Sequence, residues 1–218
     1  GFAIAALVVS LLLLGRTVVR NPAWADTFTL LSTLAEDHPE SWMSQRAVAV
    51  GFERVGDDDA ASRAYETALE LAPDHYQLLV EVAVFRNSMG STAASEALLE
   101  EAIRLMPRRP EAYSRMAEMR ILRGDGRGAH QAALRGVAAA RADREIWALL
   151  SESYVMKADL EAALRARRAS IGVESTAAGW NRMGELFQAL DRAEEAAAAR
   201  DAAARLPTPP TRGSGAGG

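Results

Sequence analysis

A unit of 34 residues recurs along this chain, and this period limits the fold more than any other feature of the sequence. The first copy runs from Trp42 to His75: it has an apolar helical run, a break at Gly56 and Asp57, and a second apolar run that closes at Pro73. Helix breakers at a fixed interval predict pairs of short antiparallel helices. The sequence therefore predicts an all-α chain of stacked helical hairpins.

The same residue classes return at the same places in later copies. The recurring structural positions are the turn glycines and closing prolines Gly56, Gly90, Gly124, Pro73 and Pro107, and the small residues Ala49, Ala61, Ala83, Ala117, Ala129, Ala163, Gly184 and Ala196. Only small side chains fit where two helices approach each other most closely, so we expect these residues at the helix crossings. Four positions depart from the pattern: Ala158 replaces the turn glycine of the fourth copy, Arg141 replaces the closing proline of the third, and Arg86 and Arg120 replace the aromatic residue on the first helix.

This pattern resembles the tetratricopeptide repeat (TPR) family over roughly residues 22 to 207. The resemblance implies an α-solenoid, which is a superhelix of antiparallel helix hairpins, built here from copies at 42–75, 76–109, 110–143, 144–176 and 177–207 after a half-repeat at 21–41. It also implies a binding module that presents a concave groove to a protein or an extended peptide. We expect no catalysis, no cofactor and no metal in this chain.

In TPR proteins the first helix of each hairpin lines the groove. In this register the candidate peptide-binding residues are Arg46, Glu53, Asn87, Glu111, Glu118, Glu145, Glu152 and Glu185. Glu118, Glu152 and Glu185 occupy equivalent positions and form a ladder of carboxylates that suits a basic or amide-rich peptide. The alternative is an ordinary solvated face, in which neighbouring arginines on the same helix neutralise these carboxylates.

The first residues of the chain are apolar from Phe2 to Leu14. As a helix they would span about 20 Å, short of the ~30 Å hydrocarbon layer of a membrane. We interpret residues 1–20 as the C-terminal part of a transmembrane helix with its juxtamembrane segment, in a fragment of a longer protein. A secretory signal peptide, with a cleavage site near Ala23 to Ala25, and a buried soluble helix are the alternatives.

The sequence supports two alternatives for the side of the membrane on which the repeats lie. Arg16 and Arg20 after the span favour a cytoplasmic array. The segment with Arg16, Arg20, Trp24 and Leu31 also resembles the junction in the transmembrane-and-TPR family, whose membrane part is similar to protein O-mannosyltransferases; that resemblance implies a lumenal or periplasmic array. We therefore expect a membrane-tethered interaction module. The alternative is the soluble C-terminal region of a multi-pass membrane glycosyltransferase that positions acceptor protein.

Composition excludes several other classes of function. The chain has no cysteine, which rules out disulfides, thiol catalysis and cysteine-ligated zinc. The net charge is −4, which argues against a nucleic-acid partner. The charge is unevenly spread, with four arginines against fifteen acidic residues in 21–103 and fourteen basic against eight acidic residues in 104–168. The Pro- and Gly-rich residues 208–218 predict a disordered tail.

No motif indicates an active site or a small-molecule substrate. The run from Asp57 to Asp59 lies where acidic residues cap a helix. The glycines from Gly124 to Gly128 coincide with a repeat turn and lack the lysine of a phosphate-binding loop. The three histidines are too far apart in sequence to form a ligand pair, so we expect no catalytic residues.

Overall fold

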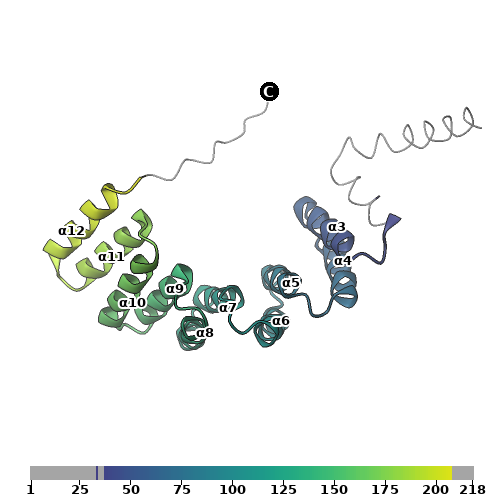
Figure 1. The fold of residues 1–218 in the computed structure, drawn as a ribbon, viewed down its shortest axis with the longest axis horizontal. Helices are drawn as coiled ribbons and strands as arrows, with labels where there is room; N and C mark the ends of the chain where they lie inside the picture. Colours follow the sequence, from purple (N-terminus) through teal and green to yellow (C-terminus); the bar gives the residue numbers. More distant parts are fainter. Residues whose placement is uncertain (1–32, 34–36, 208–218) are drawn as a thin grey trace, which may run out of the picture. The chain divides into compact units, whose positions relative to one another are not determined.

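The structure, a computed structural model, describes residue 33 and residues 37–207, and within these residues every regular element is a helix (Figure 1). Ten helices of 12 to 14 residues follow one another. They are α3 (Trp42–Val55), α4 (Asp58–Leu71), α5 (Tyr76–Ser88), α6 (Thr92–Leu105), α7 (Glu111–Leu122), α8 (Gly126–Ala139), α9 (Arg144–Met156), α10 (Leu160–Val173), α11 (Ala177–Ala189) and α12 (Ala193–Ala204). The all-α prediction is confirmed.

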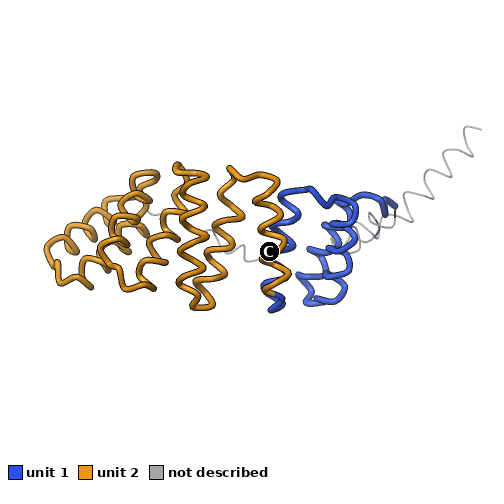
Figure 2. Tube along the Cα trace, turned by 90° about the horizontal axis from the view of Figure 1, so that it is seen from below, with its two compact units in different colours: residues 1–91 blue, residues 92–218 orange. Residues whose placement is uncertain are grey.

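The chain divides into two compact units, coloured separately in Figure 2. The N-terminal unit ends at Ser91 and contains α3, α4 and α5, with α3 against α4 and α4 against α5. The C-terminal unit begins at Thr92 and contains α6 to α12. In the C-terminal unit α7 pairs with α8, α9 with α10 and α11 with α12, and consecutive pairs are joined by contacts of α8 with α9 and of α10 with α11.

Aspartates in the turns begin several of the second helices. The carboxylate oxygen of Asp57 accepts a hydrogen bond from the backbone N–H of Ala60, at 3.0 Å. Asp125 caps α8 and Asp159 caps α10 in the same way. Each cap pairs an N–H group that the first turn of a helix leaves free. The carboxylate of Asp57 is therefore a helix cap, as its sequence position indicates.

The turn inside each hairpin places one residue in the left-handed region of backbone conformation. Glycine supplies it in three repeats, for example at Gly124 with φ 75°, and an added Cβ there would meet no other atom within 4 Å. In the last two repeats the same place is taken by Ala158, with φ 59°, and Asp191, with φ 57°. Because the glycine site has room for a side chain, the preference for glycine is a matter of backbone conformation.

Small residues lie where the two helices of a hairpin meet. The structural positions Ala49, Ala61, Ala83, Ala117, Ala129, Ala163 and Ala196 are at most 1% exposed. In the α9–α10 hairpin the hydroxyl of Ser151 donates to the carbonyl of Ala163 at 2.9 Å. In the last hairpin a Cβ added to Gly184 would lie 3.3 Å from the carbonyl oxygen of Ala196. The helices there are as close as a side chain of minimal size allows.

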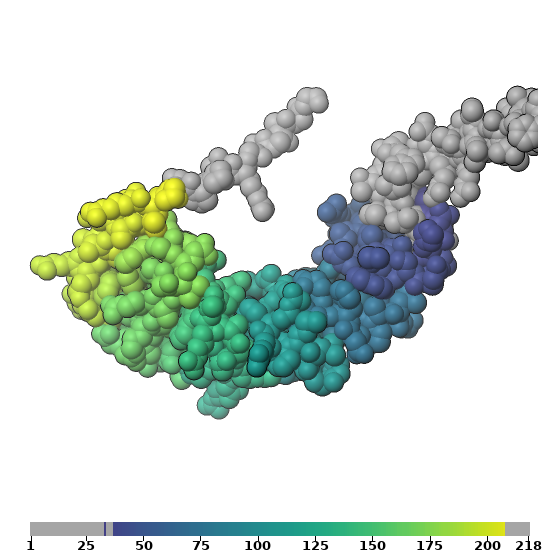
Figure 3. All heavy atoms as spheres, viewed as in Figure 1, coloured from purple at the N-terminus to yellow at the C-terminus, as the bar shows by residue number. Residues whose placement is uncertain are grey.

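Larger apolar side chains fill the space between hairpins. In the C-terminal unit Leu164 of α10 packs with Met183, Leu186 and Phe187 of α11, and all four are at most 5% exposed. Figure 3 shows that the atoms of α9 to α12, green to yellow, form a continuous surface. No single hairpin buries these residues alone, so the hairpins must stack.

The prediction of a membrane location is contradicted. Among residues 33 and 37–207, no helix combines the length and the apolar character needed to cross a bilayer. The longest of these helices have 14 residues and measure about 21 Å, whereas the hydrocarbon layer is ~30 Å thick. The segment from Phe2 to Leu14, most of the half-repeat 21–41 and the tail 208–218 lie outside the described residues. We retain neither the membrane location nor a membrane side.

We expect opposite effects from exchanging glycine and alanine at two equivalent turns. Gly124→Ala should lower the free energy of unfolding by about 1 kcal/mol, because alanine resists a positive φ. Ala158→Gly should raise it by a similar amount, because it removes the same strain. Urea unfolding of both variants measures the two changes. Equal shifts in the same direction would show that the turns are not held in this conformation.

Candidate functional site

The candidate site lies on the side of the C-terminal unit formed by the first helices α7, α9 and α11 (Figure 1). We call this side the first-helix face. Glu118, Glu152 and Glu185 stand at equivalent repeat positions on these three helices, and α7 contacts α9 directly. The three carboxylates differ in what surrounds them, and the differences decide which of them a ligand can reach.

Glu152 is the most constrained of the three. One of its oxygens accepts hydrogen bonds from Arg167 Nη2 at 2.6 Å and from Arg182 Nε at 3.0 Å. Its other oxygen accepts from Arg182 Nη2 at 2.6 Å. The hydrogen bond to Glu152 is the main cause of the raised pKa of Arg182. Glu152 therefore links α9 to both α10 and α11.

Arg167 is a buried cation in the packing layer. It stands at the repeat position that Tyr65 and Leu99 occupy in earlier copies, and its side chain is only 8% exposed. Burial lowers the pKa of Arg167, and its Nε atom has no hydrogen-bond partner. A buried cation is tolerated only beside a counter-charge. Glu152 supplies that charge, so its first role is structural.

Glu118 and Glu185 are more accessible. The side chain of Glu118 is 43% exposed and pairs with Arg115 at 2.9 Å; that of Glu185 is 61% exposed and pairs with Arg182 at 2.6 Å. Both pairs join residues three apart on one helix, an arrangement of small energy that a ligand can rearrange. Glu145, in the first turn of α9, is exposed, and Glu111, in the first turn of α7, is partly exposed.

The candidates of the N-terminal unit belong to a separate polar network. The hydroxyl of Tyr65 lies 3.1 Å from Glu53 Oε2 and 3.4 Å from Glu81 Oε1. Arg46 Nε donates to Glu81 at 2.6 Å. Burial, followed by the charges of Glu81 and Glu53, raises the pKa of Tyr65. This network ties α3 to α4 and α5, and Asn87 stands apart from it, partly exposed at the end of α5.

Sequence reasoning missed the arginine at the centre of the Glu152 cluster. The signal was present, because a count of 34 from Tyr65 through Leu99 reaches Ala133 and then Arg167. A charge at a position otherwise tyrosine, leucine or alanine predicts a buried partner. Val80 and Ser114, which follow the groove candidate Arg46 at intervals of 34 residues, are buried rather than open to a ligand.

The described part of the chain contains no group of three or more His, Cys, Asp or Glu residues that could hold a metal ion. The carboxylates of the first-helix face have arginines as their neighbours. Such a face can form charge-assisted hydrogen bonds with a peptide.

Removing the charge of Glu152 should destabilise the C-terminal unit. We expect Glu152→Gln to lower the free energy of unfolding by about 3–5 kcal/mol, because Arg167 then keeps a buried charge without a partner. Adding Arg167→Leu should recover most of the loss, since Leu99 fills the equivalent position of an earlier repeat.

Urea unfolding measures these changes, with Glu185→Gln as the control. The Glu185 side chain is largely exposed, so this control should change stability by less than about 0.5 kcal/mol. A Glu152→Gln protein as stable as the control would refute the structural role of the carboxylate.

Comparisons with known proteins show similarity in structure but no match in sequence. No protein-family profile matches this sequence, and no curated protein sequence matches it. Many solved structures do match. MamA from Desulfovibrio magneticus RS-1 superposes with a TM-score of 0.63 at 17% identity, over 76% of this chain and 94% of that one.

Two of the matching structures are described as TPR proteins. TTC0263 of Thermus thermophilus, a thermophilic TPR protein, has a TM-score of 0.58 at 16% identity and covers 75% of this chain and 90% of its own. YrrB, described as a TPR protein with an unusual peptide-binding site, has a TM-score of 0.57 at 16% identity and covers 79% of this chain and 90% of its own. The chain therefore has the fold of tetratricopeptide repeat proteins.

Proposed function

We propose that this chain is a protein-interaction scaffold, and that its first-helix face binds an extended peptide carrying basic side chains. The observation that supports this most directly is the repetition of a carboxylate at one position of α7, α9 and α11. The fold agrees with such a role, since repeat solenoids offer long preformed surfaces to partners. YrrB, a structure of the same fold, is described as having a peptide-binding site.

The spacing of the helices sets the spacing of the ligand's charges. Packed helices lie about 8–10 Å apart, and an extended peptide advances about 3.3 Å per residue. A peptide that crosses α7, α9 and α11 therefore meets a new helix about every three residues. Successive side chains of an extended peptide point to opposite sides, so basic side chains six residues apart, which a lysine at every third position supplies, would match Glu118 and Glu185, with the carboxylate of Glu152 between them.

The arginines beside these carboxylates fix them in place before a ligand arrives. Arg115 holds one oxygen of Glu118, and Arg182 holds one oxygen of Glu185. The exposed fraction of each carboxylate leaves a second oxygen for a ligand cation. An ordered acceptor loses less side-chain entropy on binding. Glu111 and Glu145, one at the start of α7 and the other at the start of α9, would extend the acidic strip.

The candidates in the N-terminal unit have a different place in this proposal. Arg46 and Glu53 hold the Tyr65 and Glu81 network together, so we assign them a structural role within the N-terminal unit. Asn87 remains a candidate for a hydrogen bond with a peptide backbone. We assign no catalytic step to any of these residues.

The glycosyltransferase alternative is not retained. It rests on the segment between Arg16 and Leu31, which lies outside the described residues. MamA, TTC0263 and YrrB carry no such description.

The test uses a labelled peptide with lysine at every third position and serine between. Glu118→Gln combined with Glu185→Gln should weaken its binding about 10-fold, the loss of two exposed charge contacts of somewhat under 1 kcal/mol each. Fluorescence anisotropy measures the affinity. Glu152 is left intact because it stabilises the fold.

Two controls separate the site from general charge effects. Glu194→Gln with Asp201→Asn removes two exposed carboxylates from α12 and should leave the affinity unchanged. A peptide with the same lysines clustered at one end should bind the parent more weakly. If the two double variants lose affinity equally, the first-helix face is not the site.

A further inference from the structure

A second surface of the C-terminal unit lies over α9, between α8 and α10. Two cavities open there, of about 540 Å³ and 270 Å³. We call them together the α8–α10 groove. The larger is lined by Gly126, Arg127, His130, Gln131, Met156 and Lys157, and the smaller by Trp147, Leu150, Tyr154, Ala162, Arg165, Ala166 and Ala169.

The floor of the groove is apolar and aromatic. Trp147, Leu150 and Tyr154 follow one another at helical spacing and share one side of α9. The ring of Tyr154, which lines the smaller cavity, meets the ring of His130, which lines the larger one, edge to face at 4.7 Å between centroids. The indole N–H of Trp147 donates to the carbonyl of Arg141 at 2.8 Å. The floor is thus fixed in position, and its apolar surface suits a bulky side chain.

The groove and the first-helix face lie on opposite sides of α9. At 100° per residue, Glu152 is turned about 140° from Trp147 and about 160° from Tyr154. The same helix therefore presents a carboxylate on one side and an aromatic strip on the other. A ligand in the groove would not compete with a peptide on the first-helix face.

Three cations around the groove have no carboxylate partner within the described residues. Arg127 and Lys157 line the larger cavity, Arg165 lines the smaller one, and none of them forms an ion pair there. This differs from Arg135 of the neighbouring surface, which binds Glu100. The ammonium group of Lys157 lies 5.9 Å from the centroid of the Tyr154 ring. These cations are free to receive an anionic ligand.

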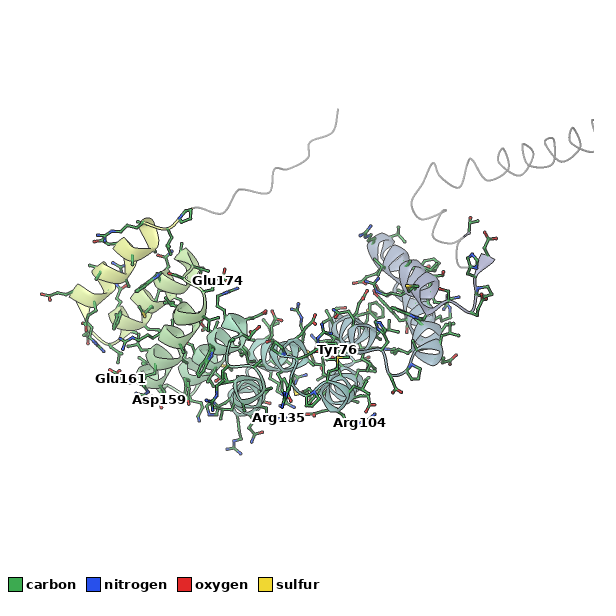
Figure 4. All side chains as sticks on the ribbon, viewed as in Figure 1. Tyr76, Arg104, Arg135, Asp159, Glu161 and Glu174 are labelled. Carbon is green, nitrogen blue, oxygen red and sulfur yellow. The ribbon has the colours of Figure 1, made fainter. Side chains whose placement is uncertain are left out.

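The acidic residues beside the groove are engaged elsewhere. Asp125 and Asp159 accept hydrogen bonds from the backbone N–H groups that they cap. Glu161, labelled with Asp159 at the beginning of α10 in Figure 4, pairs with Arg192 at 3.4 Å. The cations of the groove are therefore not neutralised locally, and an incoming carboxylate would find them available.

His130 adds a defined polar group to the groove. Its Nδ1 lies 3.2 Å from the hydroxyl oxygen of Ser153, and that hydroxyl donates its proton to the carbonyl of Leu150 at 2.7 Å. Nδ1 must then carry the hydrogen, which leaves Nε2 as the acceptor in the neutral ring. Burial, and then the charge of Lys157, lower the pKa of His130, so the ring is neutral at pH 7.

We propose that the α8–α10 groove binds an acidic peptide segment of a partner protein, with one aromatic or large apolar side chain seated on Trp147 and Tyr154. The unpaired cations give the charge complementarity, and the aromatic floor gives the anchor. A continuous polyanion such as nucleic acid fits less well. Capped or paired, Asp125, Asp159 and Glu161 keep their negative charge, and a chain with a charge on every unit would place charges beside them, whereas a peptide can have uncharged residues there.

The test uses a labelled decapeptide of glutamate and serine with a central tryptophan. Arg127→Gln, Lys157→Gln and Arg165→Gln together should weaken its binding at least 10-fold in fluorescence anisotropy at low salt. The matched control, with Arg54, Arg108 and Arg205 each changed to Gln, removes three exposed cations from elsewhere and should bind as the parent does. Helicity and thermal midpoint of both triple variants should equal those of the parent.

A second pair of probes separates the anchor from the charge. A peptide with the tryptophan replaced by serine should bind the parent at least 5-fold more weakly, and a single-stranded oligothymidine should bind more weakly than the tryptophan peptide. Equal binding to both triple variants, or preference for the oligothymidine, would overturn the proposal.

A second copy of this chain is the competing occupant, because α4 carries exposed acidic residues such as Asp59 and Glu70. Sedimentation velocity of the free protein decides this. A dimer that the groove variant abolishes and the control keeps would show that the groove binds another copy instead. The lysine peptide of the first-helix face should bind the groove variant normally, so failure of one site does not imply failure of the other.

Discussion

The close approach of the two helices in each hairpin is the constraint on which the rest of the structure depends. Gly184 stands so near the backbone of Ala196 that an added methyl group would lie 3.3 Å from its carbonyl oxygen. Ser151 uses the same proximity to donate to the carbonyl of Ala163. With small residues at the crossings, large side chains are left to fill the space between one hairpin and the next. Each hairpin therefore depends on its neighbours to cover its large apolar side chains.

Ion pairs extend this dependence into the polar surface. Glu152 joins α9 to α10 and α11 through two arginines, and Glu96 joins α6 to α7 through Arg120. These ion pairs join helices that already pack against each other through apolar side chains. They therefore help to fix the alignment of one helix along the next. The ion pair with Glu152 requires that Arg167 be buried, and removing a cation from water costs free energy. A carboxylate in such a position is constrained before any ligand is considered.

The sequence predicted the fold well, because a period records which positions must be small. The helices end at Gly56, Gly90 and Gly124 because these glycines adopt a positive φ. The glycines recur at the same place in three copies, so the sequence alone indicates these helix ends. The sequence predicted the site less well. The carboxylates at 118, 152 and 185 share a register, but the two arginines that bind Glu152, Arg167 and Arg182, lie fifteen and thirty residues further along the chain. Periodicity does not encode such pairing, and the register of Arg167 was the one sign of it.

The charges of the C-terminal unit divide between two sides of α9. On the first-helix face, the carboxylates of Glu118, Glu152 and Glu185 lie beside arginines of the same or a neighbouring helix. In the α8–α10 groove, the neighbouring aspartates are occupied by helix caps, and Arg127, Lys157 and Arg165 keep their charge unbalanced. The caps thus have an effect beyond the helix ends. Held at backbone N–H groups, these carboxylates form no ion pair with the cations of the groove. Aspartates in the turns before α8 and α10 contribute to the negative net charge of the chain. The surfaces of these two second helices can nevertheless be basic.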